Sequence, residues 1–454
     1  MGIVIVFSVA LANSTLTPAP SHQFSVKHHD MPVFDAPEEA SAPPPAYVVT
    51  DIEARVINDD SAHLVHAPSV AQLDSGGLIA TWWGGSREGG KDVKVFTSFF
   101  NPDSLSWDEP IAILSAKNTQ TQTLRYIRKL GNVVITQDPE GTLHLFYVSV
   151  SFGGWAASAI NWSTSLDEGQ TWSTSKRLIT SPFLNLSTLV KGTPVFYKDG
   201  SIGLPVYHEF AGKFGELLRI STKGEVITKT RMSKGKHSLQ PVIHVSSPTN
   251  ALALMRYAGP PDDNGNKRVL QTTTQDAGAH WSKPAFININ NPNSAIALAH
   301  HNTLGKIGVF NDINTNRYRL KLYTYNQGKQ WSPLHSFEDK TSHAQQTKQS
   351  DYEKSLQNDV GQYKASTEKK AHMVSRAIEN MCENNQCEFQ YDYPYLIQDS
   401  HNQYHLVYTW NKSAIKHVSF SLTPSTGTKP KNTAKVRNNS PANPTSTLTT
   451  ENRL

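Results

Sequence analysis

Apolar and polar positions alternate over short runs along most of the chain, and turn residues interrupt them at regular places. Val133–Thr136 and Leu143–Val148 flank the turn Asp138–Gly141, and the same arrangement recurs around Lys198–Ser201. Alternation with a period of two around Gly, Asp and Asn turns predicts β-hairpins. Helical periodicity is almost absent before Ser375, so the pattern predicts an all-β fold of many short strands.

A repeated motif, Ser-x-Asp-x-Gly-x-x-Trp, marks several of the expected hairpins. Copies of decreasing completeness stand at Ser165–Trp172, Thr274–Trp281, Thr324–Trp331 and Ser104–Trp107. In chain order the tryptophans are 65, 109 and 50 residues apart, so one repeat in the middle lacks the motif. One four-stranded unit per roughly 50–60 residues is the spacing of a β-propeller.

We therefore expect a six-bladed β-propeller over residues 47–421. Its last blade contains only three clear strands, and the run Val48–Ile57 is expected to supply the fourth. This pairing would close the ring by joining the two ends of the chain, which removes exposed strand edges. The six blades are expected at about 66–113, 128–180, 192–232, 239–290, 294–338 and 388–421.

The segments outside the blades have other compositions. Residues 1–12 contain an apolar run and a small-residue cleavage pattern, which predict a signal peptide. Residues 13–46 are rich in Pro and Ala and read as an extended linker. Residues 422–454 are rich in Thr, Pro, Asn and Lys, which predicts a disordered tail.

One polar, low-complexity insertion, 339–386, interrupts the propeller pattern before the last blade. It is rich in Gln, Lys, Ser and Asp, and its end carries apolar residues at helical spacing. We expect a surface insertion, helical in part and disordered in part. The residues at helical spacing are Val374, Ala377, Ile378 and Met381.

Charge and cysteine content exclude several classes of protein. The net charge is +5 without a dense basic patch, and no run of 18 apolar residues is present, so we expect neither a nucleic-acid partner nor a transmembrane anchor. Cys382 and Cys387 are close enough to pair in an oxidising compartment. His300 and His301 are adjacent and would face opposite sides of a strand, so no metal site and no cofactor is expected. The expectation is an exported monomer, periplasmic or secreted.

The repeated motif resembles the Asp box of the sialidase and BNR-repeat superfamily. Further segments resemble a bacterial branch of predicted neuraminidases: His66–Pro68, Gly84–Gly89, Phe152–Trp155, Ser181–Ser187, Tyr207–Phe210, His237–Pro241, Asn291–Asn293 and Tyr408–Asn411. The resemblance implies an exo-acting glycosidase that releases a terminal acidic sugar, with its site where the innermost strands meet.

Four positions match the site of that family. The resemblance implies that Asp92 is the acid/base and Tyr393 the nucleophile. It implies that Arg256 and Arg317 bind the substrate carboxylate, with Arg319 as a rival to Arg317. A guanidinium group suits this role because its N–H donors match two carboxylate oxygens.

Two positions depart from the family pattern. His66 stands where classical sialidases have an arginine, and Gln240 stands where a carboxylate should activate the tyrosine. Glutamine can bond to a phenol but cannot take its proton, and a tyrosine with a pKa near 10 is a poor nucleophile at neutral pH. Four further residues are candidates to compensate, as base or as carboxylate ligand: His208, Glu209, Arg87 and Arg219.

Three functions are therefore open at the level of sequence. The first is hydrolysis of a terminal acidic sugar, sialic acid or a relative. The second is a polysaccharide lyase reaction at a uronate, which uses histidine and tyrosine as base and acid and arginine to neutralise the carboxylate. The presence of His66 suits this chemistry. The third is glycan binding without catalysis.

Overall fold

The computed structural model describes residues 23–26, 46–57, 62–181, 185–210, 212–233, 237–325, 330–343, 346–363 and 365–425. The expected signal peptide, most of the linker and nearly all of the tail lie outside these ranges. Phe24, inside the expected linker, is fully buried and packs on Tyr197 at 5.0 Å between ring centroids. This short stretch is therefore seated against a blade, unlike an extended linker.

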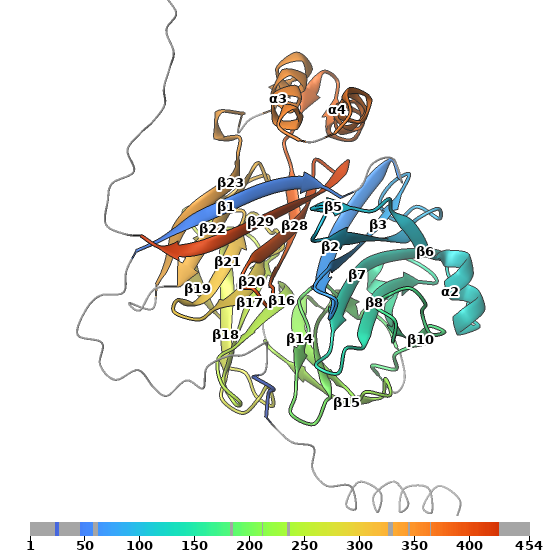
Figure 1. The fold of residues 1–454 in the computed structure, drawn as a ribbon. Coiled ribbons are helices and arrows are strands. Elements are labelled where there is room, and N and C mark those ends of the chain that lie inside the picture. Colours follow the sequence, from blue (N-terminus) through green and yellow to red (C-terminus); the bar gives the residue numbers. More distant parts are fainter. Residues whose placement is uncertain are drawn as a thin grey trace, which may run out of the picture.

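Six antiparallel sheets form the six blades of a propeller, as the hairpin pattern predicts (Figure 1). Neighbouring blades meet along their inner strands, for example β2 with β7, β16 with β20, and β27 with β2. The strands of blades 1 to 3 are β2 (Leu64–Gln72), β3 (Leu78–Gly85), β4 (Lys94–Asn101), β5 (Ser106–Trp107) and β6 (Ile111–Ser115); β7 (Lys129–Gln137), β8 (Leu143–Val150), β9 (Ser158–Ser165) and β10 (Lys176–Arg177); and β11 (Leu189–Val190), β12 (Val195–Phe196), β13 (Ile202–His208), β14 (Phe214–Ile220) and β15 (Val226–Arg231).

Blades 4 to 6 follow the same plan. Their strands are β16 (Ser238–Val245), β17 (Ala251–Tyr257), β18 (Arg268–Thr274) and β19 (Ala285–Asn290); β20 (Ala297–His301), β21 (Gly305–Phe310), β22 (Arg319–Tyr325) and β23 (Trp331–Asp339); and β27 (Tyr391–Gln398), β28 (Tyr404–Trp410), β29 (Ala414–Pro424) and β1 (Tyr47–Val56). The short helix α2 (Ala116–Thr123) connects blades 1 and 2.

Strand β1 closes the ring. It pairs with β29 from Tyr47 opposite Pro424 to Val56 opposite Lys416, and the two lie side by side in Figure 1. This confirms that the start of the folded chain supplies the fourth strand of the last blade. The ring is therefore held by hydrogen bonds between segments at opposite ends of the sequence.

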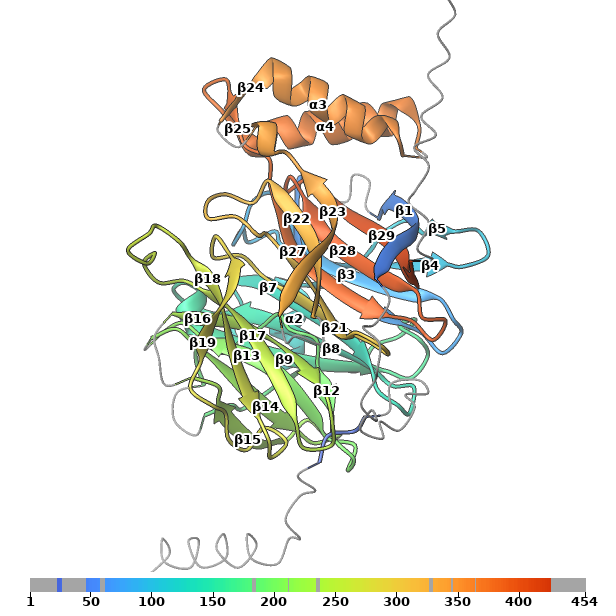
Figure 2. The ribbon, with the colours of Figure 1, turned by 90° about the vertical axis from the view of Figure 1, so that its left-hand side faces the viewer.

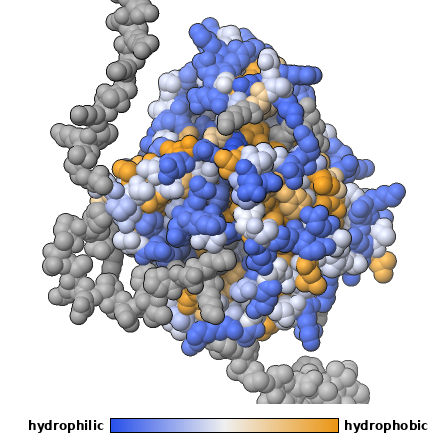
Figure 3. Space-filling view, viewed as in Figure 1, coloured by the Kyte–Doolittle hydropathy of each residue, from blue (hydrophilic) through white to orange (hydrophobic). Residues whose placement is uncertain are grey.

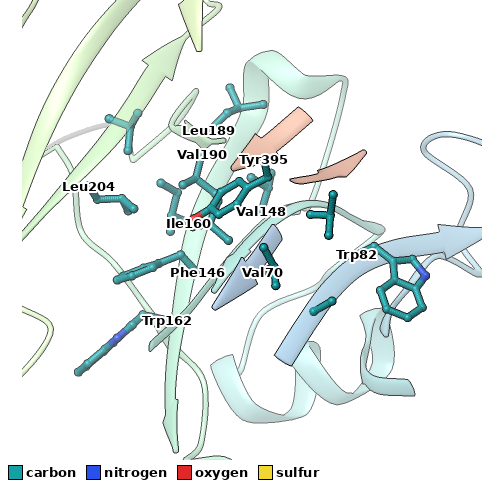
Figure 4. Close-up of a cluster of buried hydrophobic side chains, with 14 of the residues drawn as sticks. Val70, Trp82, Phe146, Val148, Ile160, Trp162, Leu189, Val190, Leu204 and Tyr395 are labelled. Atoms are coloured by element: carbon teal, nitrogen blue, oxygen red, sulfur yellow. The ribbon is translucent and has the colours of Figure 1, made fainter. Parts of the chain in front are cut away.

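Apolar side chains fill the space between neighbouring blades. Figure 4 shows one such cluster, in which Phe146, Leu204 and Tyr395 come from three different blades and face one another. Successive side chains of a strand point to opposite faces of its blade, and strands such as β3 and β8 are buried along their whole length, so both faces of a blade pack on a neighbour. The core is thus distributed around the ring.

The two complete Asp boxes form tight turns at the ends of β9 and β18. In the first, the Asp167 carboxylate accepts from the Thr171 N–H at 2.9 Å and the Ser165 hydroxyl accepts from the Gly169 N–H at 2.8 Å. Gly169 has a φ of 90°, which a residue with a side chain rarely adopts. The boxes are structural, and Asn326 and Gly328 of the third copy lie outside the described residues.

The insertion folds into two helices, α3 (Gln349–Gly361) and α4 (Thr367–Met381), next to a small sheet of β24 (Thr347–Lys348), β25 (Cys382–Glu383) and β26 (Gln386–Cys387). Both views place the helices together beyond the propeller, and their outer surface is largely hydrophilic (Figures 1, 2 and 3). The helix expected at Val374–Met381 is confirmed as part of α4, whereas α3 was not predicted. A disulfide joins Cys382 to Cys387.

The insertion packs on the segment that leads into blade 6. Tyr352 of α3 is fully buried against Phe389. Next to the insertion, blade 5 is tied to blade 6, because the buried Glu338 carboxylate at the end of β23 accepts from the Lys416 ammonium at 2.6 Å and from the Tyr408 hydroxyl. None of the described helices is long and apolar enough to cross a membrane.

Candidate functional site

All six blades contribute to one cluster of polar side chains at the end of the propeller where the innermost strands begin, which we call the site face. Most members lie at or near the start of an innermost strand, whereas Tyr207 and Arg256 lie near the ends of the second strands β13 and β17, and Arg317 precedes β22. The central members of the cluster are His66, Asn132, Lys191, Tyr207, Gln240, Arg256, Arg317, Asp392 and Tyr393.

A β-bulge that recurs in three innermost strands orients several of these side chains. The pairing of β2, β16 and β27 shifts register at equivalent places, and the residues there, Ala67, Gln240 and Tyr393, have φ values of 53°, 50° and 51°. Each is followed by a proline, which lacks an N–H group and is tolerated in strands mainly at edges and bulges. Bulges next to active sites typically re-aim a side chain. The left-handed backbone, which costs about 1–3 kcal/mol per residue, marks a functional constraint.

Two segments that carry the family resemblance support one such bulge. The backbone N–H of Ala67 donates to the hydroxyl of Thr409 at 3.1 Å, and the N–H of Val65 donates to the carbonyl of Lys412 at 3.0 Å. Ala67 belongs to His66–Pro68 and Thr409 to Tyr408–Asn411. These segments therefore hold the start of β2 against blade 6.

Gln240 is the centre of the hydrogen-bond network. Its amide nitrogen lies 3.3 Å from the phenol oxygens of both Tyr393 and Tyr207, and its carbonyl oxygen accepts from the Arg256 guanidinium at 3.0 Å. Asn132 donates to Tyr207 at 3.2 Å. Burial raises the pKa of Tyr207, so this neighbour is a neutral phenol at physiological pH.

Arg317 joins the cluster through Asp392, the residue before Tyr393. Its guanidinium lies 2.7 Å from the Asp392 carboxylate and donates to the carbonyl of Asn293 at 3.1 Å. Arg319, the rival in the sequence, instead pairs with Asp312 at 2.6 Å. The structure thus brings Arg256 and Arg317 to Tyr393 through its hydrogen-bonded partner and its sequence neighbour.

His66 packs directly against the tyrosine. The ring centroids of His66 and Tyr393 are 4.5 Å apart, and the His66 ring also meets Trp83 at 5.3 Å. Burial lowers the pKa of His66 to about 4, although the charges of Asp392 and Glu88 oppose this. His66 is therefore neutral at physiological pH and available as a proton acceptor.

Lys191 lies beneath the tyrosine and was not expected. Its ammonium donates to the carbonyl of Pro394 at 3.0 Å and lies 4.9 Å from the ring centroid of Tyr395 and 5.9 Å from that of Tyr393. Burial lowers the pKa of Lys191 to about 7. The lysine thus fixes the backbone carbonyl of Pro394, the residue that directly follows Tyr393.

Asp92 closes the loop 86–92 at the site face of blade 1. Its carboxylate accepts from the backbone N–H and the hydroxyl of Ser86, at 2.6 and 2.9 Å. Partial burial raises the pKa of Asp92, but the hydrogen bonds from Ser86 and the charge of Arg87 outweigh it and lower the pKa below its ordinary value. Glu88, in the same loop, acts electrostatically on both His66 and Arg317.

Two expected residues lie away from the cluster. The His208 ring stacks on Phe214 at 4.7 Å, because Tyr207 takes the face of β13 that meets the channel and its neighbour must take the other. Arg219 pairs with Gly203, five positions along β13 from His208, and bonds to Asp199 at 2.5 Å. That is roughly 17 Å along the strand, at the opposite end of the blade. The structure thus places neither side chain in the cluster around Tyr393.

The remaining candidates lie at the site face with different contacts. The Glu209 backbone N–H is held by the Ser187 hydroxyl at 2.7 Å, and the Glu209 charge acts on Tyr207. Arg87 is exposed in the loop 86–92. Within the described residues no three His, Cys, Asp or Glu side chains gather as metal ligands.

Several buried polar atoms of the cluster have no hydrogen-bond partner among the described residues. They are His66 Nδ1, Trp83 Nε1, Arg256 Nε and Asp392 Oδ2. Buried polar groups are nearly always bonded, so a concentration of exceptions indicates a place that accepts a polar ligand or water. The cluster is therefore the candidate active site.

Comparisons with known proteins agree with this architecture. Residues 76–406 match the BNR repeat-like domain family, whereas no curated protein sequence matches the chain. A Hadza microbial sialidase has a similar structure, with 14% identity and a TM-score of 0.55 over 80% of this chain and 66% of its own. This chain thus spans just under two thirds of that sialidase.

Two further solved structures show the range of proteins with this fold. The NanB sialidase of Streptococcus pneumoniae has 10% identity and a TM-score of 0.55, covering 81% of this chain and 70% of its own. An alpha-L-arabinofuranosidase of Fusarium graminearum has 11% identity and a TM-score of 0.53, covering 82% and 97%. Identities this low show a shared fold alone. On the family match and the six-bladed architecture, the chain belongs to the BNR repeat-like family of the sialidase superfamily.

Proposed function

We propose that this protein is an exo-acting glycoside hydrolase that releases a terminal acidic sugar, sialic acid or a relative, from a glycan. The observation that supports this most is that Arg256 and Arg317 are both linked to Tyr393, the first through Gln240 and the second through the neighbouring Asp392. Two guanidinium groups near one phenol suit a substrate whose carboxylate lies next to its anomeric carbon. Neutral sugars have no carboxylate with which the two guanidinium groups could pair.

In this proposal the phenol oxygen of Tyr393 bonds to the anomeric carbon while the bond to the leaving oxygen breaks. The phenol proton passes to Glu209, and a carboxylic acid of the loop 86–92 gives its proton to the leaving oxygen. Water then replaces Tyr393 at the anomeric carbon: one of its protons stays on the sugar and the other restores the acid, while Glu209 returns the phenol proton to Tyr393. Asp92 is the acid by family position, and Glu88 is the alternative because Ser86 holds Asp92 in its ionised form.

Elimination at a uronate is the second candidate, and two observations favour it. Gln240, which cannot take a proton, replaces the carboxylate expected beside Tyr393, and neutral His66 contacts the same ring. In this reaction His66 takes the proton from C5, the C4–O bond breaks, and Tyr393 gives its proton to the leaving oxygen. The product contains a C4–C5 double bond that absorbs in the ultraviolet.

One set of assays separates these reactions. Purified protein is incubated with an aryl sialoside and with glucuronate-containing glycans, and free sugar and ultraviolet absorbance are both followed. Hydrolysis predicts released sugar without absorbance, and elimination predicts absorbance from the uronate glycans. Binding of an acidic sugar without either product would leave only the third function, glycan binding.

We also infer that the protein acts outside the cytoplasm, as a monomer. The Cys382–Cys387 disulfide supports export, because such bonds persist mainly in oxidising compartments. Cell fractionation and light scattering test the two statements, and a reduced cytoplasmic protein or a stable dimer would contradict them.

A further inference from the structure

Two exposed aromatic rings stand together on the site face of blade 2. Tyr126 is 52% exposed and Phe152 is 71% exposed, and their ring centroids are 5.4 Å apart. Tyr126 precedes β7, and Phe152 follows β8 in the loop that leads to β9. Since β7 begins and β8 ends at the site face, both rings lie on the rim of the candidate active site. Grouped exposed apolar side chains typically mark an interaction surface.

The loop that carries Phe152 is packed against β7. The Trp155 ring covers Gly131 so closely that a Cβ atom there would lie 2.5 Å from it, and the Lys129 ammonium stands 3.9 Å from the Trp155 ring centroid. The same ammonium lies against Gly89, where a Cβ atom would be 3.1 Å away. Lys129 therefore ties the loop after β8 to the loop 86–92 of blade 1.

Positive charge surrounds the aromatic pair. Arg125, Arg128 and Arg87 are exposed, and the charges of Arg128 and Arg87 act on Lys129. Glu88 is the carboxylate that acts on both Lys129 and His66, so this surface is continuous with the site. We call it the blade 2 rim and define it as Arg87, Tyr126, Arg128, Lys129, Phe152 and Trp155.

We propose that the blade 2 rim binds the sugars that follow the terminal acidic sugar, in a glycan that carries repeated negative charges. The flat faces of Tyr126 and Phe152 suit the apolar C–H faces of pyranose rings, and Arg87 and Arg128 suit carboxylate or sulfate groups. The inference rests on the proposed function and narrows its substrate to a polyanionic chain. A neutral glycan with a single acidic cap would leave the arginines of the rim unused.

Binding of defined oligosaccharides tests this inference. Calorimetry with the Tyr393→Phe protein, used to prevent turnover, compares sialic acid and glucuronic acid with their oligomers of two, four and six sugars, at low and high salt. Maltose oligomers of equal length serve as neutral probes. We expect affinity for one acidic series to rise with length by about tenfold or more. We also expect this gain to weaken at high salt.

Variants of the rim should remove that gain without affecting the monosaccharide. Tyr126→Ala with Phe152→Ala should remove the dependence on length, and Arg128→Gln should weaken the dependence on salt. Leu166→Ala and Lys223→Ala, in turns at the opposite end of the propeller, serve as controls and should change neither. All these side chains are exposed, so the folded state should be retained.

Three results would overturn the inference. Equal affinity for the acidic monosaccharide and its hexamer would refute it while the proposed function stands. Equal affinity for neutral and acidic oligomers would refute the polyanionic substrate. Failure of every acidic sugar to bind would refute the proposed function and this inference together.

Discussion

The side-chain amide of Gln240 donates to the phenol oxygen of Tyr393 across 3.3 Å. A phenol that accepts this bond keeps its own proton for another partner. The protein therefore holds Tyr393 as a positioned phenol, where the superfamily pattern has a tyrosine deprotonated by a carboxylate.

Replacing Gln240 by Glu tests what Tyr393 does. Under the proposed hydrolysis, a carboxylate beside the phenol acts as a base, and we expect kcat to rise by about tenfold or more. The measurement is steady-state hydrolysis of an aryl sialoside by wild type and variant. A fall in kcat together with loss of an ultraviolet-absorbing product would instead favour elimination.

Replacing Arg317 by Lys tests the carboxylate clamp. Lysine keeps the charge beside Asp392 but loses the planar fork of donors, so we expect KM to rise on the order of tenfold or more with small change in stability. The structure provides a matched control in Arg319→Lys, because both arginines are about one-fifth exposed and pair with a buried aspartate. Equal effects of the two substitutions on KM would contradict the assignment.

Replacing Lys191 by Met tests the buried ammonium. The folded state lowers the pKa of Lys191 to about 7, so between pH 7 and its ordinary value the unfolded chain binds more protons. Stability of the wild type should therefore rise with pH in this range, by up to a few kcal/mol. The variant should lack this rise between pH 7 and 9, as followed by chemical denaturation.

The same substitution should also reduce activity, because it removes the donor to Pro394 next to Tyr393. Lys191→Arg retains a charge and a donor, and serves as the comparison. Full activity of Lys191→Met with a normal pH profile would show that the lysine has no positioning role.

His66 should make the protein sensitive to acid. Its pKa is about 4 in the folded state and about 6.5 in the unfolded state, so protons bind the unfolded chain first as pH falls. The contribution of His66 to stability should decline by about 3 kcal/mol between pH 6.5 and 4. His66→Gln should lose stability less steeply over this range, whereas His401→Gln, on an exposed turn, should follow the wild type.

Much of the fold was predictable because its signals are local. Asp167 and Gly169 make their turn with their own neighbours, so the motif identifies the hairpin wherever the blade lies. The pairing of β1 with β29 was predictable for a different reason, since a three-stranded blade needs a partner. Helix α3 was missed because its buried residues Tyr352, Leu356 and Val360 are sparse among polar positions.

The site was harder to predict because it depends on strand direction. Arg219 follows an apolar run in the sequence, but β14 runs away from the site face and carries the arginine to the wrong end. His208 was expected at the site, but neighbouring residues of a strand face opposite sides, and it is Tyr207 that faces the channel. Lys191 and Asp392 gave no motif of their own, although the recurring proline after Ala67, Gln240 and Tyr393 was a visible signal for three innermost strands.

The closing strand has a consequence for the order in which this protein is made. β1 leaves the ribosome before blades 1 to 5 and β29 after them, so β1 stays without its partner strand until the five blades between them have been made. Blades 1 to 5 can stack on one another during that interval, but the ring stays open until the last blade is complete. A chain interrupted before residue 414 would therefore carry an unclosed propeller, however well its earlier blades had formed.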